Sequence, residues 1–433
     1  MLFNSLEFIV FFVVVAFCVM RLPTVYRKYG LLVASYWFYS MWSWKFAGLL
    51  AFTCVIHWIA ARINKRWAVW CAIGGSVMIL AAFKYLGLWV DSIVMPVGIS
   101  FYTFQAISYT VDCYKGKLDN KRSFLDVALY ISFFPQLLSG PIVRAPDFFP
   151  QLDSAASQDC KAMRIACLDV KIAFVQFSFG LFKKVFVADR LSSYVGRVFE
   201  NCNLFDGWTL WLAAIAYTIQ IYCDFSGYSD MAIGVARGLG FEYKQNFNHP
   251  YLSTSVTEFW RRWHISLSTW LRDYVYIPLG GNRRGRLRQH LNQMITMLIG
   301  GAWHGADMSF IAWGGLHGAA LCGHKVWAKS HKMWRPVAWL LTMTTILVGW
   351  ILFRADNFSQ AWTFISRMFC FSSGITWYHP HVFFALFLTM AGHVFYNALS
   401  RNDYWVKTAA IIAFLLALLY PPGNTSPFIY FQF

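Results

Sequence analysis

Charged residues are scarce in this sequence of 433 residues, because only 13% are Asp, Glu, Lys or Arg while 58% are hydrophobic. A soluble globular domain carries about 25% charged residues. This scarcity excludes a single aqueous core that could cover the apolar surface, so lipid must solvate much of the chain. The composition therefore predicts an all-α, polytopic integral membrane protein.

Several motifs of catalytic and binding sites are also absent. There is no CxxC, HxxxH or HExxH pair, which argues against a metal site. The sequence likewise lacks a GxSxG elbow, a Walker loop and a dinucleotide fingerprint. The ten cysteines lie mostly in apolar runs, where they act as small hydrophobic residues. We therefore predict no metal and no permanently bound cofactor.

Positive charge is in excess, with 37 Lys and Arg against 20 Asp and Glu and a net charge of +17. In a membrane protein this excess indicates cytoplasmic loops beside anionic lipid, and we expect no nucleic-acid partner. The basic loops at 21–28 and 62–66 are separated by two apolar segments, so they should lie on the same side. The first apolar run precedes its basic residues, which favours a retained span with its N-terminus outside over a cleaved signal peptide.

Apolar segments that are long enough to cross a bilayer, or nearly so, predict about ten to twelve transmembrane helices. They fall at about 2–20, 30–44, 46–62, 67–90, 165–188, 208–240, 289–306, 309–328, 336–353, 379–398 and 405–420. No internal repeat or low-complexity linker interrupts them. We therefore predict one domain over residues 1–433.

Two further apolar stretches are broken by proline and glycine. One runs from Met95 to Tyr102, and the other from Ser132 to Arg144. Irregular backbone at membrane depth is tolerated where it is buried in protein or lines a cavity. We expect these stretches to be re-entrant segments around a central pore or funnel.

His304 ends an apolar segment within Trp303-His304-Gly305. An ionisable side chain at membrane depth is costly and is a functional candidate by default. Neutral imidazole is a natural general base. Glycines at 300, 301 and 305 would leave room for a substrate, and Trp303 could wall the site. The alternative is a structural histidine hydrogen-bonded to a neighbouring helix.

His264 lies in a second unusual segment, where Trp260, Trp263 and His264 would share one helical face through i, i+3, i+4 spacing. This pattern predicts an interfacial helix whose aromatic face points into a cavity. A simple interfacial anchor explains the same pattern.

Two other polar residues in apolar surroundings are candidates for supporting roles. His317 follows His304 by thirteen residues, and we take it as a second-shell or structural residue. Asp224 would either position a histidine or an arginine or form a buried ion pair, and the sequence does not separate these alternatives.

Four arginines lie close together at Arg283, Arg284, Arg286 and Arg288. They are either an orientation signal or a site for a phosphate-rich cytoplasmic ligand.

The final residues, from Phe428 to Phe433, are aromatic and include Tyr430, whereas termini are usually polar and frayed. This tail, at 421–433, either packs in a groove or delivers Tyr430 to an active site as a nucleophile.

Five motifs occur in order along the chain: Pro96-Val97-Gly98-Ile99-Ser100-Phe101, Gln136-Leu137-Leu138-Ser139-Gly140-Pro141, Cys223-Asp224-Phe225-Ser226-Gly227, Phe259-Trp260-Arg261-Arg262-Trp263-His264 and Trp303-His304-Gly305. With them the sequence resembles the membrane-bound O-acyltransferase (MBOAT) family, in its bacterial cell-surface branch. That branch includes membrane subunits of alginate, peptidoglycan and cellulose O-acetylation and the teichoic acid D-alanylation transporter. The core motifs span about residues 95–330.

The resemblance implies a ring of tilted helices around a thinned, funnel-like centre. It implies transfer of an acyl group from a cytoplasmic thioester, acetyl-CoA in the acetylating members, to an extracytoplasmic acceptor. His304 matches the family's catalytic histidine and His264 its second functional histidine. The aromatic tail resembles one whose tyrosine, here Tyr430, is proposed to hold the acyl group in transit.

We therefore expect an O-acetyltransferase of the bacterial inner membrane that modifies a cell-surface polysaccharide or peptidoglycan. Its arginines at 283, 284, 286 and 288 would hold the CoA phosphates, and an extracytoplasmic esterase-like acetyltransferase would receive the acetyl group. Two alternatives are a transporter or flippase for a cell-envelope precursor and a scaffold for a secretion complex. A transporter would predict an inverted repeat with paired broken helices, which the sequence does not display.

Overall fold

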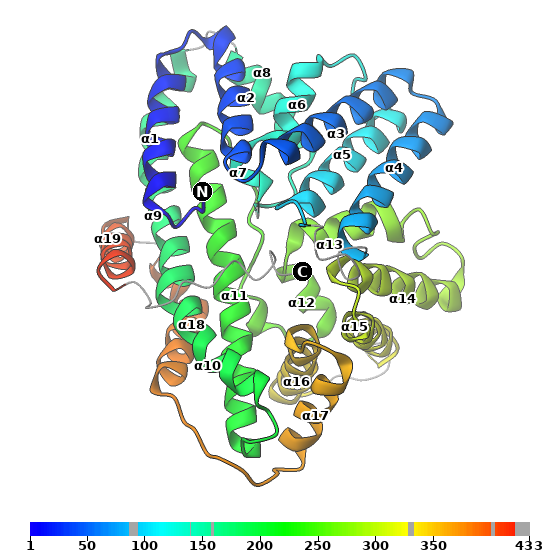
Figure 1. Ribbon diagram of the computed structural model, residues 1–433, viewed down its shortest axis with the longest axis vertical. Coiled ribbons are helices and arrows are strands. Elements are labelled where there is room, and N and C mark those ends of the chain that lie inside the picture. The colour runs from blue at the N-terminus through cyan, green and yellow to red at the C-terminus, as the bar shows by residue number, and fades with distance from the viewer. Residues whose placement is uncertain (86–93, 139, 157–159, 328–332, 400–402, 421–433) are drawn as a thin grey trace. The chain divides into compact units, whose positions relative to one another are not determined.

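A computed structural model of the chain describes residues 1–85, 94–138, 140–156, 160–327, 333–399 and 403–420. Within these ranges the regular elements are helices, and β-type pairing is limited to an isolated bridge between Phe205 and Ile375 (Figure 1). The all-α prediction is confirmed for the described part of the chain.

The elements of the first half are α1 (Leu6–Arg21), α2 (Thr24–Ser40), α3 (Trp44–Ile63), α4 (Arg66–Tyr85), α5 (Ile99–Tyr114), α6 (Phe124–Ser132), α7 (Phe134–Leu137), α8 (Ala145–Ala156), α9 (Cys160–Leu181), the π-helix η2 (Phe182–Ala188), α10 (Asp189–Glu200) and α11 (Gly207–Gly238). The elements of the second half are the 3-10 helix η3 (Pro250–Leu252), α12 (Val256–Arg262), α13 (Ile265–Leu271), the π-helix η4 (Arg272–Tyr276), α14 (Gly285–His304), α15 (Met308–Trp327), α16 (Arg335–Arg354), α17 (Phe358–Phe369), α18 (Pro380–Leu399) and α19 (Asp403–Leu419).

The chain divides into two compact units, which we describe separately. Unit 1 comprises Met1–Leu181 and Tyr228–Gln245, and unit 2 comprises Phe182–Gly227 and Asn246–Phe433. The prediction of a single domain over residues 1–433 stays a prediction.

Each predicted apolar segment lies largely within a helix. Among the described helices, α3, α4 and α16 are long and apolar enough to cross a membrane by length and composition. The ring of ten to twelve transmembrane helices around a funnel stays a prediction.

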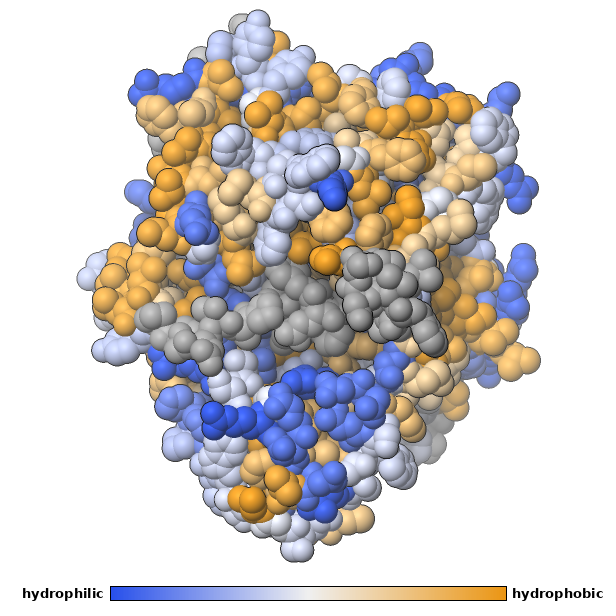
Figure 2. Space-filling model, viewed as in Figure 1, coloured by the Kyte–Doolittle hydropathy of each residue, from blue (hydrophilic) through white to orange (hydrophobic). Residues whose placement is uncertain are grey.

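The outward faces of α1 and α4 are apolar. Large exposed side chains there are Leu6, Val10, Val13, Val14 and Phe17 on α1 and Trp67, Trp70, Val77 and Met78 on α4. Figure 2 shows hydrophobic side chains gathered over the N-terminal helices of unit 1. Large apolar side chains exposed along whole helix faces are costly in water and favourable in lipid, so they fit a membrane protein.

The two broken segments of unit 1 are buried against one another. Gly98 adopts a left-handed conformation with φ +76°, and a Cβ atom there would lie 2.3 Å from the Leu137 carbonyl oxygen. Tyr39 Oη donates to the Val97 carbonyl oxygen at 2.9 Å, and Gln136 Nε2 donates to that of Tyr130 at 2.6 Å. Protein groups thus satisfy irregular backbone in these segments. The pore or funnel itself stays a prediction.

The basic loops of unit 1 meet a common segment. Lys28 pairs with Asp126 at 2.9 Å, and Arg62 donates to the Lys121 carbonyl oxygen at 3.3 Å. Loops 21–28 and 62–66 therefore lie on the same side of this unit, as predicted.

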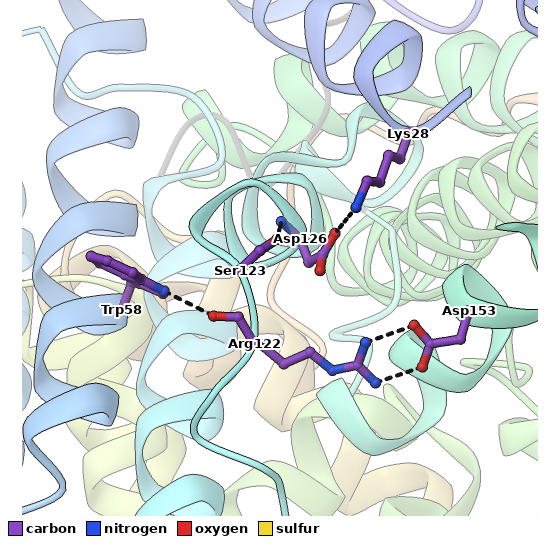
Figure 3. A network of polar contacts seen from close by, with 6 residues as sticks. All are labelled: Lys28, Trp58, Arg122, Ser123, Asp126 and Asp153. Atoms are coloured by element: carbon purple, nitrogen blue, oxygen red, sulfur yellow. Dashed lines mark hydrogen bonds and ion pairs between the residues drawn. The ribbon is translucent and has the colours of Figure 1, made fainter. Parts of the chain in front are cut away.

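The same region contains a bidentate ion pair (Figure 3). The Arg122 guanidinium donates two hydrogen bonds to the Asp153 carboxylate, each 2.6 Å long. The Arg122 carbonyl oxygen accepts a hydrogen bond from Trp58 Nε1 at 3.0 Å. The hydrogen bonds from Arg122 lower the pKa of the Asp153 carboxyl below its usual value. These contacts fix α8 and the loop before α6 to the end of α3.

Candidate active site

Unit 2 contains the two histidines that the sequence singles out, His264 and His304, together with His317 and Asp224. Their exposed fractions are 1%, 4%, 0% and 1%. Burying so many ionisable groups is costly unless each is bonded or has a functional use. Their surroundings therefore decide between structural and chemical roles.

His304 is the last residue of α14 and lies among aromatic rings. Its ring centroid is 4.6 Å from that of Trp303, 5.1 Å from that of Trp313 and 4.9 Å from that of Phe353. Trp303 contacts His304, and its role as a wall of the active site stays a prediction. An imidazole in this setting is surrounded by apolar surface that restricts water, which strengthens its interactions with any reacting group.

Glycines bring α14 and α15 into close contact beside His304. A Cβ at Gly301 would lie 2.3 Å from the Phe310 carbonyl oxygen, and one at Gly314 would lie 2.6 Å from that of Met297. A Cβ at Gly305 would lie 2.3 Å from the Phe310 ring. The expectation that Gly301 and Gly305 leave room for a substrate is wrong, because α15 already fills that space.

His264 occupies a break between two short helices, and the expectation of one continuous amphipathic helix through it is wrong. α12 ends at Arg262, and Trp263 is extended. His264 has φ +40°, a left-handed conformation that is uncommon outside glycine, and α13 starts at Ile265. Non-glycine residues in this conformation cluster at functional sites, where their surroundings hold them in place.

Asn246 holds the break in place. Its Oδ1 accepts hydrogen bonds from the Ser266 N–H at 3.1 Å and the Ser266 hydroxyl at 2.9 Å, and lies 3.2 Å from His264 Nδ1. The Ile265 N–H donates to the Asn246 carbonyl oxygen at 2.9 Å. Sequence reasoning missed Asn246, because its partners lie about twenty residues further along the chain.

These contacts define the protonation of His264. Because Asn246 Oδ1 is an acceptor, the neutral imidazole donates from Nδ1, and Nε2 is the nitrogen with the lone pair. Burial lowers the pKa of His264 to about 3, so the ring is neutral at physiological pH. Nε2 of His264 is therefore a hydrogen-bond acceptor.

A continuous series of aromatic rings joins the two histidines. Successive ring centroids lie 6.4, 5.0, 4.8, 5.8 and 4.9 Å apart along the path His264, Phe247, Trp263, Trp350, Phe353 and His304. Such contacts contribute about 0.5–1.5 kcal/mol each beyond area burial. The two histidines thus belong to one packed aromatic network.

His317 lies behind Trp313, on the next helix. Its ring is 4.9 Å from that of Trp313 and 5.2 Å from that of Trp260, and a Cβ at Gly349 would lie 2.7 Å from its Nε2. Trp313 in turn contacts His304. Trp313 therefore lies between His317 and His304, and the supporting role of His317 stays a prediction.

Asp224 forms a buried ion pair, which is one of the two alternatives that the sequence left open. Lys184 on η2 lies 2.7 Å from Asp224 and 2.6 Å from Asp189, and all three side chains are at most 2% exposed. Sequence reasoning missed Lys184 and Asp189. The available signal was a lysine within the apolar run 165–188, which is rare at membrane depth.

The four arginines lie at the start of α14. Arg283, Arg284 and Arg286 are exposed, and Arg288 is partly buried. The preceding loop is tethered, because Asn292 Nδ2 donates to the Gly281 carbonyl oxygen and Gln289 Nε2 donates to Asn282 Oδ1, each at 3.1 Å. The arrangement presents fixed positive charge beside the N-terminal dipole of α14, which favours anions.

Tyr430 and the rest of the tail at 421–433 lie outside the described residues. The chain leading to them is anchored, since Arg190 donates to the Tyr420 carbonyl oxygen at 2.5 Å. Within the described ranges, no group of three or more His, Cys, Asp or Glu side chains could hold a metal ion.

Comparison with known proteins agrees with these features. A family model described as membrane-bound O-acyltransferase (MBOAT) matches residues 115–358, which is more than half of the chain and includes His264 and His304. The chain belongs to this family. It is therefore an integral membrane protein and an acyltransferase, rather than the transporter or scaffold that its residues alone left open.

Curated relatives include several cell-envelope enzymes. The chain is 41% identical over 380 residues to the probable alginate O-acetylase AlgI of Azotobacter vinelandii, a match that covers 81% of this chain and 74% of the relative. It is 34% identical over 417 residues to the peptidoglycan O-acetyltransferase of Helicobacter pylori, covering 83% and 78%. It is 27% identical over 297 residues to the teichoic acid D-alanyltransferase of Bacillus subtilis, covering 66% and 70%.

Proposed function

We propose that this acyltransferase moves acetyl groups from cytoplasmic acetyl-CoA across a bacterial inner membrane for O-acetylation of a cell-surface polysaccharide or peptidoglycan. The observation that carries the proposal is the packing of His264 and His304 into one buried aromatic network. The names of two relatives, an alginate O-acetylase and a peptidoglycan O-acetyltransferase, support acetyl as the transferred group.

His304 is the proposed general base. A hydroxyl, with Tyr430 the leading candidate, attacks the thioester carbonyl carbon while His304 takes the hydroxyl proton. The tetrahedral intermediate collapses, the C–S bond breaks, and the proton passes from His304 to the departing thiolate. Such a base contributes about 10²–10⁴-fold to rate.

His264 is the proposed orienting residue for the donor. Two roles were open for it, namely orienting the thioester and stabilising the oxyanion. A neutral ring that donates from Nδ1 to Asn246 offers a lone pair at Nε2, not a donor. This favours the orienting role, in which Nε2 accepts a hydrogen bond from an amide N–H of the pantetheine arm.

The arginines at 283, 284, 286 and 288 are the proposed contacts of the 3′-phosphate and diphosphate of CoA. Their exposure and the tethered loop support this role, because guanidinium groups bind phosphate oxygens in a bidentate manner. An extracytoplasmic esterase-like acetyltransferase would then accept the acetyl group and pass it to the polymer.

The reaction is tested with purified protein in lipid nanodiscs supplied with ¹⁴C-labelled acetyl-CoA, by measuring released thiol and labelled acceptor. The wild type should turn over the donor, and His304→Gln should lose about 10²–10⁴-fold of that rate while remaining folded. Full turnover by folded His304→Gln would remove His304 from the mechanism.

The arginine role has its own test, based on a donor without phosphates. Changing the four arginines to glutamine should raise KM for acetyl-CoA and leave kcat unchanged. KM for the acetyl thioester of N-acetylcysteamine, which has no phosphate, should not change. An equal rise for both donors would show that the arginines do not bind phosphate.

The tail role is tested with Tyr430→Phe, which removes only the hydroxyl. This variant should bind acetyl-CoA with the wild-type affinity but pass no acetyl group to an acceptor. Intact transfer by the variant would exclude Tyr430 as the nucleophile.

A further inference from the structure

Unit 2 contains a fully buried ionic cluster that the proposed chemistry does not use. Lys184 Nζ lies 2.6 Å from Asp189 Oδ1 and 2.7 Å from Asp224 Oδ1, with side-chain exposures of 0%, 0% and 2%. Buried ion pairs are weak stabilisers compared with apolar packing, because desolvation of the charges is costly. Their best-attested use is to specify one arrangement of the chain.

The cluster joins two elements, one of which contacts His264. Lys184 lies on η2, while Asp224 lies on α11. The next residue on α11, Phe225, presents its ring edge-on to His264, with centroids 4.6 Å apart and an interplanar angle of 87°. The position of Asp224 therefore sets the position of a ring that confines the His264 imidazole.

η2 also contacts the helix that leads to the C-terminal tail. α19 packs against η2, and Arg190, two residues beyond the end of η2, donates to the Tyr420 carbonyl oxygen at 2.5 Å. π-helices are rare and frequently occur at functional sites. The short helix η2 is thus bonded to α11, whose Phe225 contacts His264, and packs against α19, which leads to the C-terminal tail.

We infer that Lys184 is a positioning residue that, through its ion pair with Asp224, holds Phe225 against His264. The same element, η2, thereby keeps His264 at a defined position relative to Tyr420, the residue that precedes the C-terminal tail. The inference rests on the proposed role of His264. Asp189 pairs with the same ammonium from the start of α10 instead of from α11.

Two isosteric substitutions separate positioning from charge balance. Asp224→Asn and Asp189→Asn each remove one carboxylate and leave Lys184 with a charged partner. Only the first breaks the ionic link to α11. Asp224→Asn should lower kcat about 10-fold to 100-fold with KM unchanged, as expected for small misplacements at an active site. Asp189→Asn should keep kcat within about threefold of the wild type.

Modification by diethylpyrocarbonate, located by mass spectrometry, gives a readout that needs no acyl donor. Asp224→Asn should expose His264 and raise its modification rate, whereas Asp189→Asn should not. In all variants the exposed His381 should react and the buried His57 should stay protected. These two residues show that the protein remains folded.

The outcomes separate this inference from the proposed reaction. Equal effects of the two substitutions on kcat and on His264 modification would overturn the positioning role of Lys184. If the wild type does not turn over acetyl-CoA, the proposed function fails, but the modification rates still decide whether the Lys184–Asp224 pair holds His264.

Discussion

Each unit buries a histidine, but the two units bond them in different ways. In unit 1, His57 is 0% exposed, and its Nδ1 and Nε2 lie 2.7 Å from Thr110 Oγ1 and 2.8 Å from Ser76 Oγ. These hydroxyls come from α5 and α4, while His57 lies on α3. Both ring nitrogens are therefore used to join three helices, as polar side chains do between membrane helices.

In unit 2, His317 lies within α15, but the two candidate catalytic histidines lie at helix boundaries instead. His264 has a left-handed conformation between α12 and α13, and His304 is the final residue of α14. His57 thus meets the structural alternative that the sequence allowed for His304, a histidine bonded to neighbouring helices. The difference teaches that the backbone setting of a buried histidine, and not its burial, identifies a candidate for chemistry.

An ion pair of unit 1 and the ionic cluster of unit 2 also differ, in this case in how far their side chains are exposed to solvent. In unit 1, Arg122 and Asp153 pair near the surface with side-chain exposures of 27% and 53%. In unit 2, Lys184 and its two carboxylates are sealed from solvent. The surface pair can be lost at small cost, whereas loss of one buried partner leaves an uncompensated charge.

A large difference between the two units should appear at His264. His264→Asn suits the left-handed backbone, which asparagine tolerates, but removes the imidazole. Turnover of acetyl-CoA should fall about 100-fold, the cost of a misplaced donor, with little change in melting temperature. The exposed His381→Ala serves as the control and should keep wild-type turnover. A folded His264→Asn variant with wild-type turnover would place His264 with His57 among the structural histidines.

A substitution at His57 should have the opposite profile. His57→Leu leaves the Thr110 and Ser76 hydroxyls without their histidine partner inside packed helices. Unfolding free energy should drop by about 1–3 kcal/mol, measured by denaturation in detergent. Turnover per folded molecule should not change. A loss of turnover without a loss of stability would contradict the structural role.

Acid should destabilise the protein through His264, which lies outside the candidate membrane spans. Its folded pKa of about 3 is below the unfolded value of about 6.5, so the unfolded chain binds the proton first. The stabilising contribution is therefore present above pH 6.5 and is lost as pH falls toward 3. Between pH 6.5 and 5 the loss should be about 2 kcal/mol.

Thermal unfolding measured from pH 7 to 5 tests whether the protein loses stability as the pH falls. The decline in melting temperature should be steeper for the wild type than for His264→Gln. Parallel curves for the two proteins would show that His264 is not the titrating group.

The smallest effect should come from the surface pair of unit 1 (Figure 3). Asp153→Asn should lower stability by about 0.2–1 kcal/mol, and added salt should reduce even this difference. Turnover should be unchanged. A loss of several kcal/mol would mean that the pair acts as a buried one.

Local patterns in the sequence were sufficient to predict part of the fold. The apolar segments became helices, because their hydrophobic runs are a local property of the sequence. The position of His304 at the end of its helix also followed from the local sequence.

Long-range contacts explain what the sequence did not predict. The i, i+3, i+4 pattern at Trp260, Trp263 and His264 continues through a break that depends on Asn246, a residue 18 positions before His264. Lys184 and Asp224 come from different helices, so no spacing rule joins them. Gly301 and Gly305 could equally admit a substrate or a neighbouring helix, and only the packing of α15 distinguishes these outcomes.

A side-by-side assay of two matched variants tests the central claim most directly. His304→Gln and His57→Gln make the same chemical change at buried histidines of the two units, and initial acetyl-CoA turnover is measured per folded molecule in nanodiscs. The account predicts a loss of at least about 100-fold for His304→Gln and a rate within about twofold of the wild type for His57→Gln. Equal rates for the two variants, or a larger loss at His57, would contradict it.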